Sequence, residues 1–161
     1  MLRDLPLKAV YESETDDLLR DFYIPTLFEA KSYDRAVGFF SGAMLSYAAQ
    51  GLSAFVRSNG GVMRLVVGGE LDDEDVDAIR QGYGLREVSE KVGRSMVEEI
   101  DRIEDDLFHT RVELLSWLVA AGRLDVKVAL KRRGMFHSKI GVLRDAAGDA
   151  VVFQGSANET V

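Results

Sequence analysis

The sequence contains no cysteine and only two histidines, His109 and His137, among its 161 residues. The absence of cysteine excludes disulfide scaffolds, thiolate metal sites and cysteine nucleophiles. Two histidines are too few for a histidine-rich metal site, so we expect neither a metal nor another cofactor. Any catalysis must therefore depend on few residues.

Long apolar runs are also missing. No run approaches the ~20 residues that span a bilayer, and the charged opening Met1 to Pro6 lacks the apolar core of a signal peptide. We therefore expect a cytoplasmic protein without a membrane partner. With 47% apolar and 29% charged residues, residues 1–161 are predicted to form a single domain. Order-promoting residues continue to Val161, so we expect this domain to be the N-terminal part of a longer protein.

Net charge is −7, which disfavours a protein that coats nucleic acid with its whole surface. Between residues 123 and 144, however, the sequence has seven basic residues and a single acidic residue, Asp125. Such a run is often only a solvated face. Here its centre, Lys131-Arg132-Arg133, leads directly to His137, and we interpret these three residues as contacts for DNA.

Apolar patterns predict an α/β domain. We expect strands at residues 35–40, 62–69, 124–130, 136–143 and 150–153. Helices are expected from Ser41 to Ser58, briefly after Asp72 and Asp73, and over a long stretch from Met96 that ends at Gly122. The first strand, helix and strand predict a parallel pair. Together they indicate a mixed, mostly parallel sheet flanked by helices. His109 lies in the long helix without a partner at ligand spacing, and we assign it no role.

Residues His137 and Lys139 form the most informative cluster. On a strand their side chains would share one face with Gly141, about 6.6 Å apart along the strand. The next strand ends in Gly155-Ser156-Ala157-Asn158, which offers a hydroxyl, an amide and backbone N–H groups. These groups are suited to binding a phosphate.

Phosphodiester cleavage needs a nucleophile, donors for the charged oxygens and an acid for the leaving alkoxide. A neutral imidazole can attack phosphorus and form a phosphohistidine, which water then hydrolyses. One histidine cannot be nucleophile and acid in the same step. A second copy of His137, supplied by a homodimer, would solve this problem.

The pattern His137-Ser138-Lys139 followed by Gly155-Ser156-Ala157-Asn158 resembles the H-x-K and G-S-x-N motifs of the phospholipase D superfamily. The amino-acid sequence around both motifs is similar to that of phospholipase D-like domains found at the N-terminus of bacterial helicase-type proteins and beside restriction nucleases. The segments Arg35 to Ser41 and Leu115 to Ala120 are similar to the same group. The resemblance implies a metal-independent nuclease-like phosphodiesterase acting on DNA, joined to a C-terminal helicase domain.

In that resemblance His137 is the nucleophile in one subunit and the proton donor in the other. Lys139 and Asn158 bind the phosphate oxygens, and Ser156 supports them. The family's aspartate falls where this chain has Arg144, so Asp145, one residue later, is only a doubtful supporting residue. Glu70, after a predicted strand, is a weak candidate for the carboxylate that orients His137.

Other interpretations of the same residues remain open. His137 could be an ordinary strand histidine, and the domain could be a catalytically silent DNA-binding or assembly module of a helicase. Action on lipid headgroups is disfavoured because no amphipathic helix with a basic face is evident.

Overall fold

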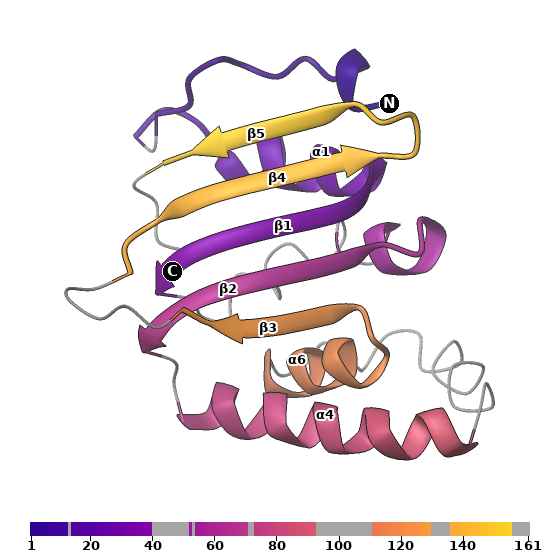
Figure 1. Ribbon diagram of the computed structural model, residues 1–161. Coiled ribbons are helices and arrows are strands. Elements are labelled where there is room, and N and C mark those ends of the chain that lie inside the picture. Colours follow the sequence, from indigo (N-terminus) through magenta and orange to yellow (C-terminus); the bar gives the residue numbers. More distant parts are fainter. Residues whose placement is uncertain are drawn as a thin grey trace.

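The computed structural model describes residues 1–12, 14–39, 52, 54–70, 73–92, 111–129 and 136–155 (Figure 1). Within these ranges five strands form one sheet in the order β3-β2-β1-β4-β5. The strands are β1 (Ala30–Phe39), β2 (Val62–Glu70), β3 (Leu124–Val128), β4 (Lys139–Asp145) and β5 (Ala150–Gln154). The helical segments are η1 (Leu2–Asp4), η2 (Leu19–Tyr23), α1 (Ile24–Glu29), η3 (Ala54–Ser58), α4 (Asp73–Val92) and α6 (Arg111–Ala120).

Strand pairing confirms an α/β domain with a mixed sheet. β1 pairs in parallel with β2, as the sequence predicted, and β2 pairs in parallel with β3. β4 lies antiparallel to both β1 and β5. The described part of the sheet therefore has two parallel and two antiparallel pairings, and all its strands except β4 run in the same direction. β4 and β5 form a hairpin because a short turn joins only antiparallel strands.

Alternation along the strands separates a core face from an open face. Leu65 and Val67 of β2, Val37 of β1 and Leu143 of β4 are at most 1% exposed and pack with Phe55 of η3. Residues that alternate with the core positions of these strands, such as Asp34 and Arg64, point to the other face. In Figure 1, α1 lies behind the sheet, α4 and α6 lie beside β3, and none of the described helices crosses the front of the sheet.

Helix α4 covers 20 residues, so the short helix expected after Asp73 was wrong. Gly82 and Gly84 suggest from the sequence that a helix ends here. The packing of α4 against α6 explains why Gly82 lies inside a helix instead. A Cβ on Gly82 would lie 2.6 Å from the carbonyl oxygen of Ser116 in α6. The glycine thus permits the two helices to approach closely. Residues 93–110, which include His109 and most of the predicted long helix, lie outside the described ranges.

The helix ends predicted from two glycines are confirmed. Gly60, after η3, has φ +61°, and Gly122, after α6, has φ +67°. This left-handed conformation is one that glycine adopts without steric cost, and it commonly ends helices. Among the described residues, no helix combines the length and the apolar character that crossing a membrane requires.

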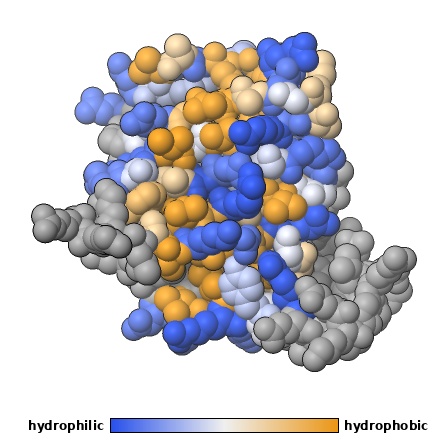
Figure 2. Space-filling view, in the orientation of Figure 1, coloured by the Kyte–Doolittle hydropathy of each residue, from blue (hydrophilic) through white to orange (hydrophobic). Residues whose placement is uncertain are grey.

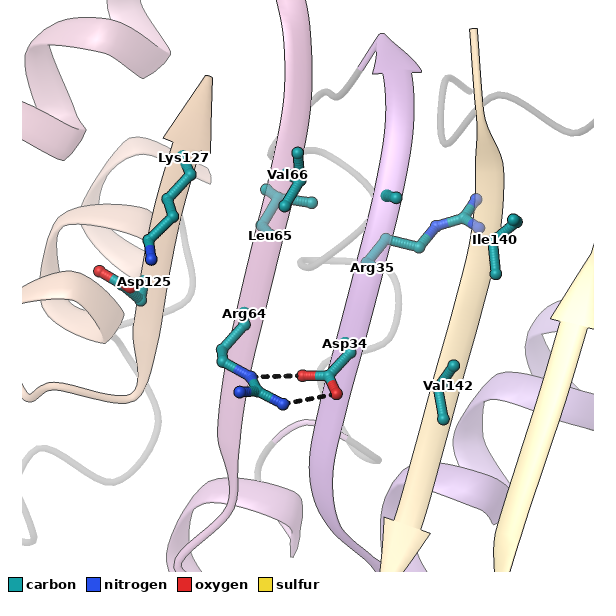
Figure 3. A pocket seen from close by; sticks show the side chains of 10 residues that line it. Asp34, Arg35, Arg64, Leu65, Val66, Asp125, Lys127, Ile140 and Val142 are labelled. Carbon is teal, nitrogen blue, oxygen red and sulfur yellow. Dashed lines mark hydrogen bonds and ion pairs between the residues drawn. The ribbon is translucent and has the colours of Figure 1, made fainter. Parts of the chain in front are cut away.

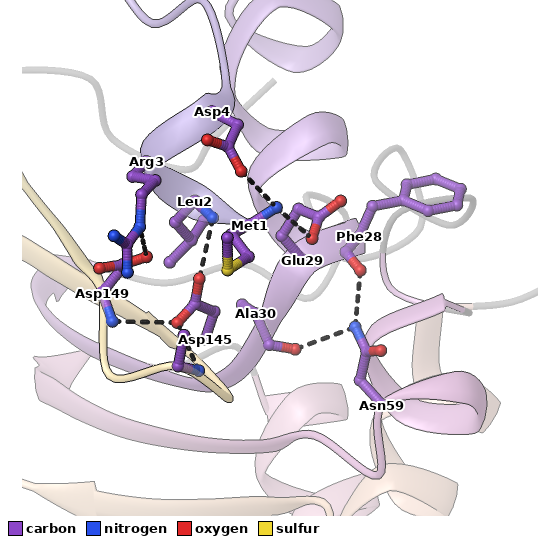
Figure 4. Close-up of polar contacts among 11 residues, drawn as sticks. Met1, Leu2, Arg3, Asp4, Phe28, Glu29, Ala30, Asn59, Asp145 and Asp149 are labelled. Carbon is purple, nitrogen blue, oxygen red and sulfur yellow. Dashed lines mark hydrogen bonds and ion pairs between the residues drawn. The ribbon is translucent and has the colours of Figure 1, made fainter.

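The N-terminal residues are tied to the turn between β4 and β5 (Figure 4). Leu2 is 2% exposed, and its N–H donates a hydrogen bond of 2.9 Å to Oδ2 of Asp145. Oδ1 of Asp145 accepts hydrogen bonds of 2.9 Å from the N–H groups of Ala147 and Asp149. Asp145 therefore joins two distant parts of the chain at the end of β4.

Asparagine at position 145 is expected to destabilise the domain at neutral pH, because its amide would face the N–H of Leu2 as a second donor. The hydrogen bond from Leu2, with those from Asp149 and Ala147, lowers the pKa of Asp145 from 3.8. A lowered folded-state pKa gives stability that is present above pH 3.8 and is lost as pH falls through the folded-state value. Urea unfolding should show a lower midpoint for Asp145→Asn at pH 7 and a smaller difference near pH 3. Equal midpoints at pH 7 would contradict this role.

Candidate functional site

His137 and Lys139 lie where the chain enters β4. The strand begins at Lys139, and residues 136–138 are irregular. The predicted strand from Phe136 was therefore wrong at its start, and strand alternation does not fix the direction of the His137 side chain. His137 is exposed, whereas Lys139 is partly buried and pairs with Val37 of β1.

Gly38 of β1 makes room for this segment. A Cβ on Gly38 would lie 2.7 Å from the carbonyl oxygen of Phe136, 3.3 Å from Cα of His137 and 3.5 Å from its Nδ1. Real Cβ atoms essentially never approach backbone oxygen as closely as the first of these distances. Glycine at this position thus allows β1 to hold His137 at the edge of the sheet.

A second glycine lies at the same edge. The register of β1 and β2 shifts between Val37, which pairs with Val67, and Phe39, which pairs with Glu70. β2 therefore has one extra residue beside β1, as in a β-bulge. A Cβ on Gly68 would collide with the carbonyl oxygen of Gly38. Bulges are frequent next to functional sites, where they redirect the chain.

The end of β5 reaches the same place. The N–H of Gly155 donates a hydrogen bond of 3.2 Å to the carbonyl oxygen of Lys139. This contact brings the start of the Gly155-Ser156-Ala157-Asn158 segment beside the start of β4. Ser156 and Asn158 themselves lie outside the described residues, as do Lys131, Arg132 and Arg133.

The two residues proposed to supply a carboxylate, Glu70 and Asp145, stand at opposite ends of the sheet. Glu70 ends β2, and its backbone pairs with Phe39, one residue beyond the Gly38 that contacts His137. Asp145 ends β4, six residues after Lys139 and hence about 20 Å away along the strand. Hydrogen bonds from three backbone N–H groups occupy its carboxylate. Asp145 thus stabilises the turn and cannot contact the His137 segment.

A groove on the open face is lined by residues of β1, β2, β3 and β4 (Figure 3). Its floor includes the paired residues Ala36 and Ile140, and Lys127 lies at its border. Asp34 in the groove accepts hydrogen bonds of 2.6 and 2.7 Å from Arg64 and one of 3.0 Å from Arg144. The bonds from Arg64 hold the pKa of Asp34 below its ordinary value. Figure 2 shows the resulting mixture of apolar and charged side chains on this face.

The sequence analysis assigned no role to Gly38, Gly68 or Arg35. Gly38 follows an apolar strand segment, and a glycine inside such a segment is a sign of close backbone approach. Arg35, two residues earlier, is 3% exposed. Its position in the alternating pattern Tyr33, Arg35, Val37 could have indicated a buried cation.

Within the described ranges, no group of three or more His, Asp or Glu side chains is arranged to hold a metal ion. Comparison of the chain with protein-family models, with curated proteins and with solved structures found no match.

Proposed function

We propose that this chain is a phospholipase D-like phosphodiesterase domain that cleaves DNA without a metal, with His137 as nucleophile and Lys139 as a phosphate-binding cation. The observation that carries the proposal is the meeting of two chain segments at one edge of the sheet. The exposed His137, the start of β4 and the amide of Gly155 come together there. These are the two segments whose amino-acid sequences resemble the H-x-K and G-S-x-N motifs.

In the proposed reaction a nitrogen of neutral His137 attacks phosphorus, and the bond from phosphorus to the leaving oxygen breaks. The leaving alkoxide takes a proton from the partner subunit's His137, which enters the step as imidazolium. Water then attacks phosphorus, the phosphorus–nitrogen bond to His137 breaks, and the now neutral second imidazole accepts the proton of the water. Lys139 balances negative charge on the phosphate oxygens throughout, and the amide of Asn158 donates hydrogen bonds to them.

A homodimer completes this site because each chain has a single His137 that can serve the reaction. A two-fold axis beside the exposed edge would bring two identical segments to one phosphate. We further propose that the domain acts within a helicase or restriction system.

Cleavage of labelled single- and double-stranded DNA in excess EDTA tests the proposal. We expect the wild-type chain to cleave at least one of them at an unchanged rate when EDTA is added, since no step requires a divalent cation. A DNA fragment joined to the protein through an acid-labile, base-stable phosphorus–nitrogen bond should be recovered after rapid quenching. A dimeric wild type that binds DNA without cutting it would instead favour the silent binding module.

A further inference from the structure

The two outer strands of the sheet differ in how their outer edges are covered. On β3, Arg86 of α4 donates a hydrogen bond of 2.9 Å to the carbonyl oxygen of Leu124, and the N–H of Val126 donates one of 3.0 Å to Oη of Tyr83. Both backbone groups point away from β2, because alternate residues of a strand bond in opposite directions and the N–H of Ala129 donates to β2. Side chains of α4 thus occupy groups with which a further strand could pair.

Backbone groups on the outer edge of β5 point away from the sheet. At one end of the β4–β5 ladder the N–H of Asp145 donates a hydrogen bond of 3.0 Å to the carbonyl oxygen of Asp149, and at the other end Gly155 donates one of 3.2 Å to Lys139. Alternation between these two bonds fixes the residues whose N–H and C=O groups face away from β4. They are Ala150, Val152 and Gln154. Within the described part of the chain, no strand pairs with this edge.

The N-terminal segment, residues 5–12, passes above β5 in Figure 1 but does not pair with it. None of the hydrogen bonds between described backbone groups joins this segment to β5. Leu5 and Leu7 pack against the core, which places the segment on the core side of the strand. Val152 lies on the open face, where it pairs with Val142 of the groove, and it is 67% exposed. The outer edge of β5 is therefore accessible from the open face.

The composition of β5 gives this edge none of the usual protection against pairing. Sheets commonly block their outer strands with charged side chains, proline or a bulge. Residues 150–154 include no charged residue and no proline, and their register with β4 has no shift. An edge without these features is a template for another strand.

The same residues are complementary to a second copy of themselves. In an antiparallel pair with a two-fold axis at Val152, this residue lies opposite its own copy and Ala150 lies opposite the partner's Gln154. Each of these residues can then donate and accept a backbone hydrogen bond, as in a regular ladder. On the core face, Val151 lies opposite the partner's Phe153, an apolar pair that stabilises a sheet. No two like charges oppose each other along the strand.

We propose that the outer edge of β5 is a homodimer interface, at which β5 pairs antiparallel with β5 of a second copy and the two sheets join into one. Gly155, at the candidate site, is three residues from Val152, or about 10 Å along the strand. The two-fold axis therefore leaves the two candidate sites about 20 Å apart along the strands. This interface is thus additional to the contact that the proposed function requires. Because the strands are short, we expect a reversible dimer with a Kd of about 10–100 µM.

Sedimentation equilibrium over about 1–300 µM protein tests the inference. Val152→Lys should weaken this association at least about 10-fold, because the axis places two like charges opposite each other. Val152→Glu should do the same, and an equimolar mixture of the two variants should associate at least as tightly as the wild type. Only an interface in which this residue meets its own copy predicts such a rescue. Val128→Lys is the matched control, because Val128 is an exposed valine of β3, whose edge α4 covers.

Val152→Pro provides a second route if the charged variants do not fold. Proline removes an N–H that makes no bond to β4, so it should weaken association and preserve the sheet, which far-UV circular dichroism would verify. If the contact at the candidate site also forms, the wild type should reach tetramers and the Val152 variants should stop at dimers. A wild type that stays monomeric, or charged variants whose mixture does not associate, would overturn the inference. An assembly that no Val152 substitution changes, but that cleaves DNA, would overturn it and leave the proposed function standing.

Discussion

Replacing His137 with alanine is expected to lower DNA cleavage in EDTA by at least about 10³-fold, because both the nucleophile and the proton donor are lost. The segment before β4 is exposed at His137, so alanine there should leave folding intact. Single-turnover cleavage and the recovery of protein-bound phosphate both measure the effect. Binding of DNA should change little, because most of the affinity for a polyanion comes from lysine and arginine contacts along its phosphates.

His109→Ala is the control for this substitution, because His109 is the only other histidine in the chain. It should cleave as the wild type does. A His137→Ala protein that still cleaves in EDTA would disprove the phosphohistidine mechanism. Equal amounts of wild-type and His137→Ala chains, allowed to exchange subunits, should retain about a quarter of the wild-type activity if a two-fold dimer forms the site, and about half if it does not.

Gly38→Ala has the second largest expected effect, a loss of about 10²-fold in cleavage rate with the fold retained. The added Cβ would lie 2.7 Å from the carbonyl oxygen of Phe136 and 3.3 Å from Cα of His137. To relieve this contact, the segment that carries His137 must move away from β1. Displacement of a catalytic group by about 1 Å can cost a factor of 10² in rate. Cleavage kinetics together with far-UV circular dichroism measure the effect.

Gly84→Ala separates this local displacement from a general effect of removing glycine. Gly84 lies within α4, and a Cβ there would have no atom within 4 Å. Alanine at this position should leave cleavage unchanged and raise helix stability by about 0.5–1 kcal/mol. A Gly38→Ala protein that cleaves at the wild-type rate would show that the close contact with His137 has no functional importance.

Local sequence predicted several elements because their signals are local. β2 is mostly apolar and follows Gly60, whose positive φ comes just after the preceding helix. β3 alternates, and the four-residue turn between β4 and β5 ends in Gly148 and Asp149, two residue types that favour turns. The signal for α4 failed because Gly82 is needed for contact with α6, and contact between helices far apart in the chain leaves no mark in the local pattern.

Some features of the candidate site were likewise predictable from the sequence, and others depend on the tertiary structure. The sequence by itself determined its residue types, since His137, Lys139 and Gly155 to Asn158 occur at spacings that resemble known motifs. It also determined the α/β class, because apolar periodicity follows the local geometry of helices and strands. Tertiary structure alone decided that His137 lies outside β4, against Gly38, and that Asp145 closes a turn about 20 Å from Lys139. It alone buried Arg35 beside Lys139. The physical reason is that strand register and backbone approach depend on residues about 100 positions apart, and no local pattern records which of these will meet.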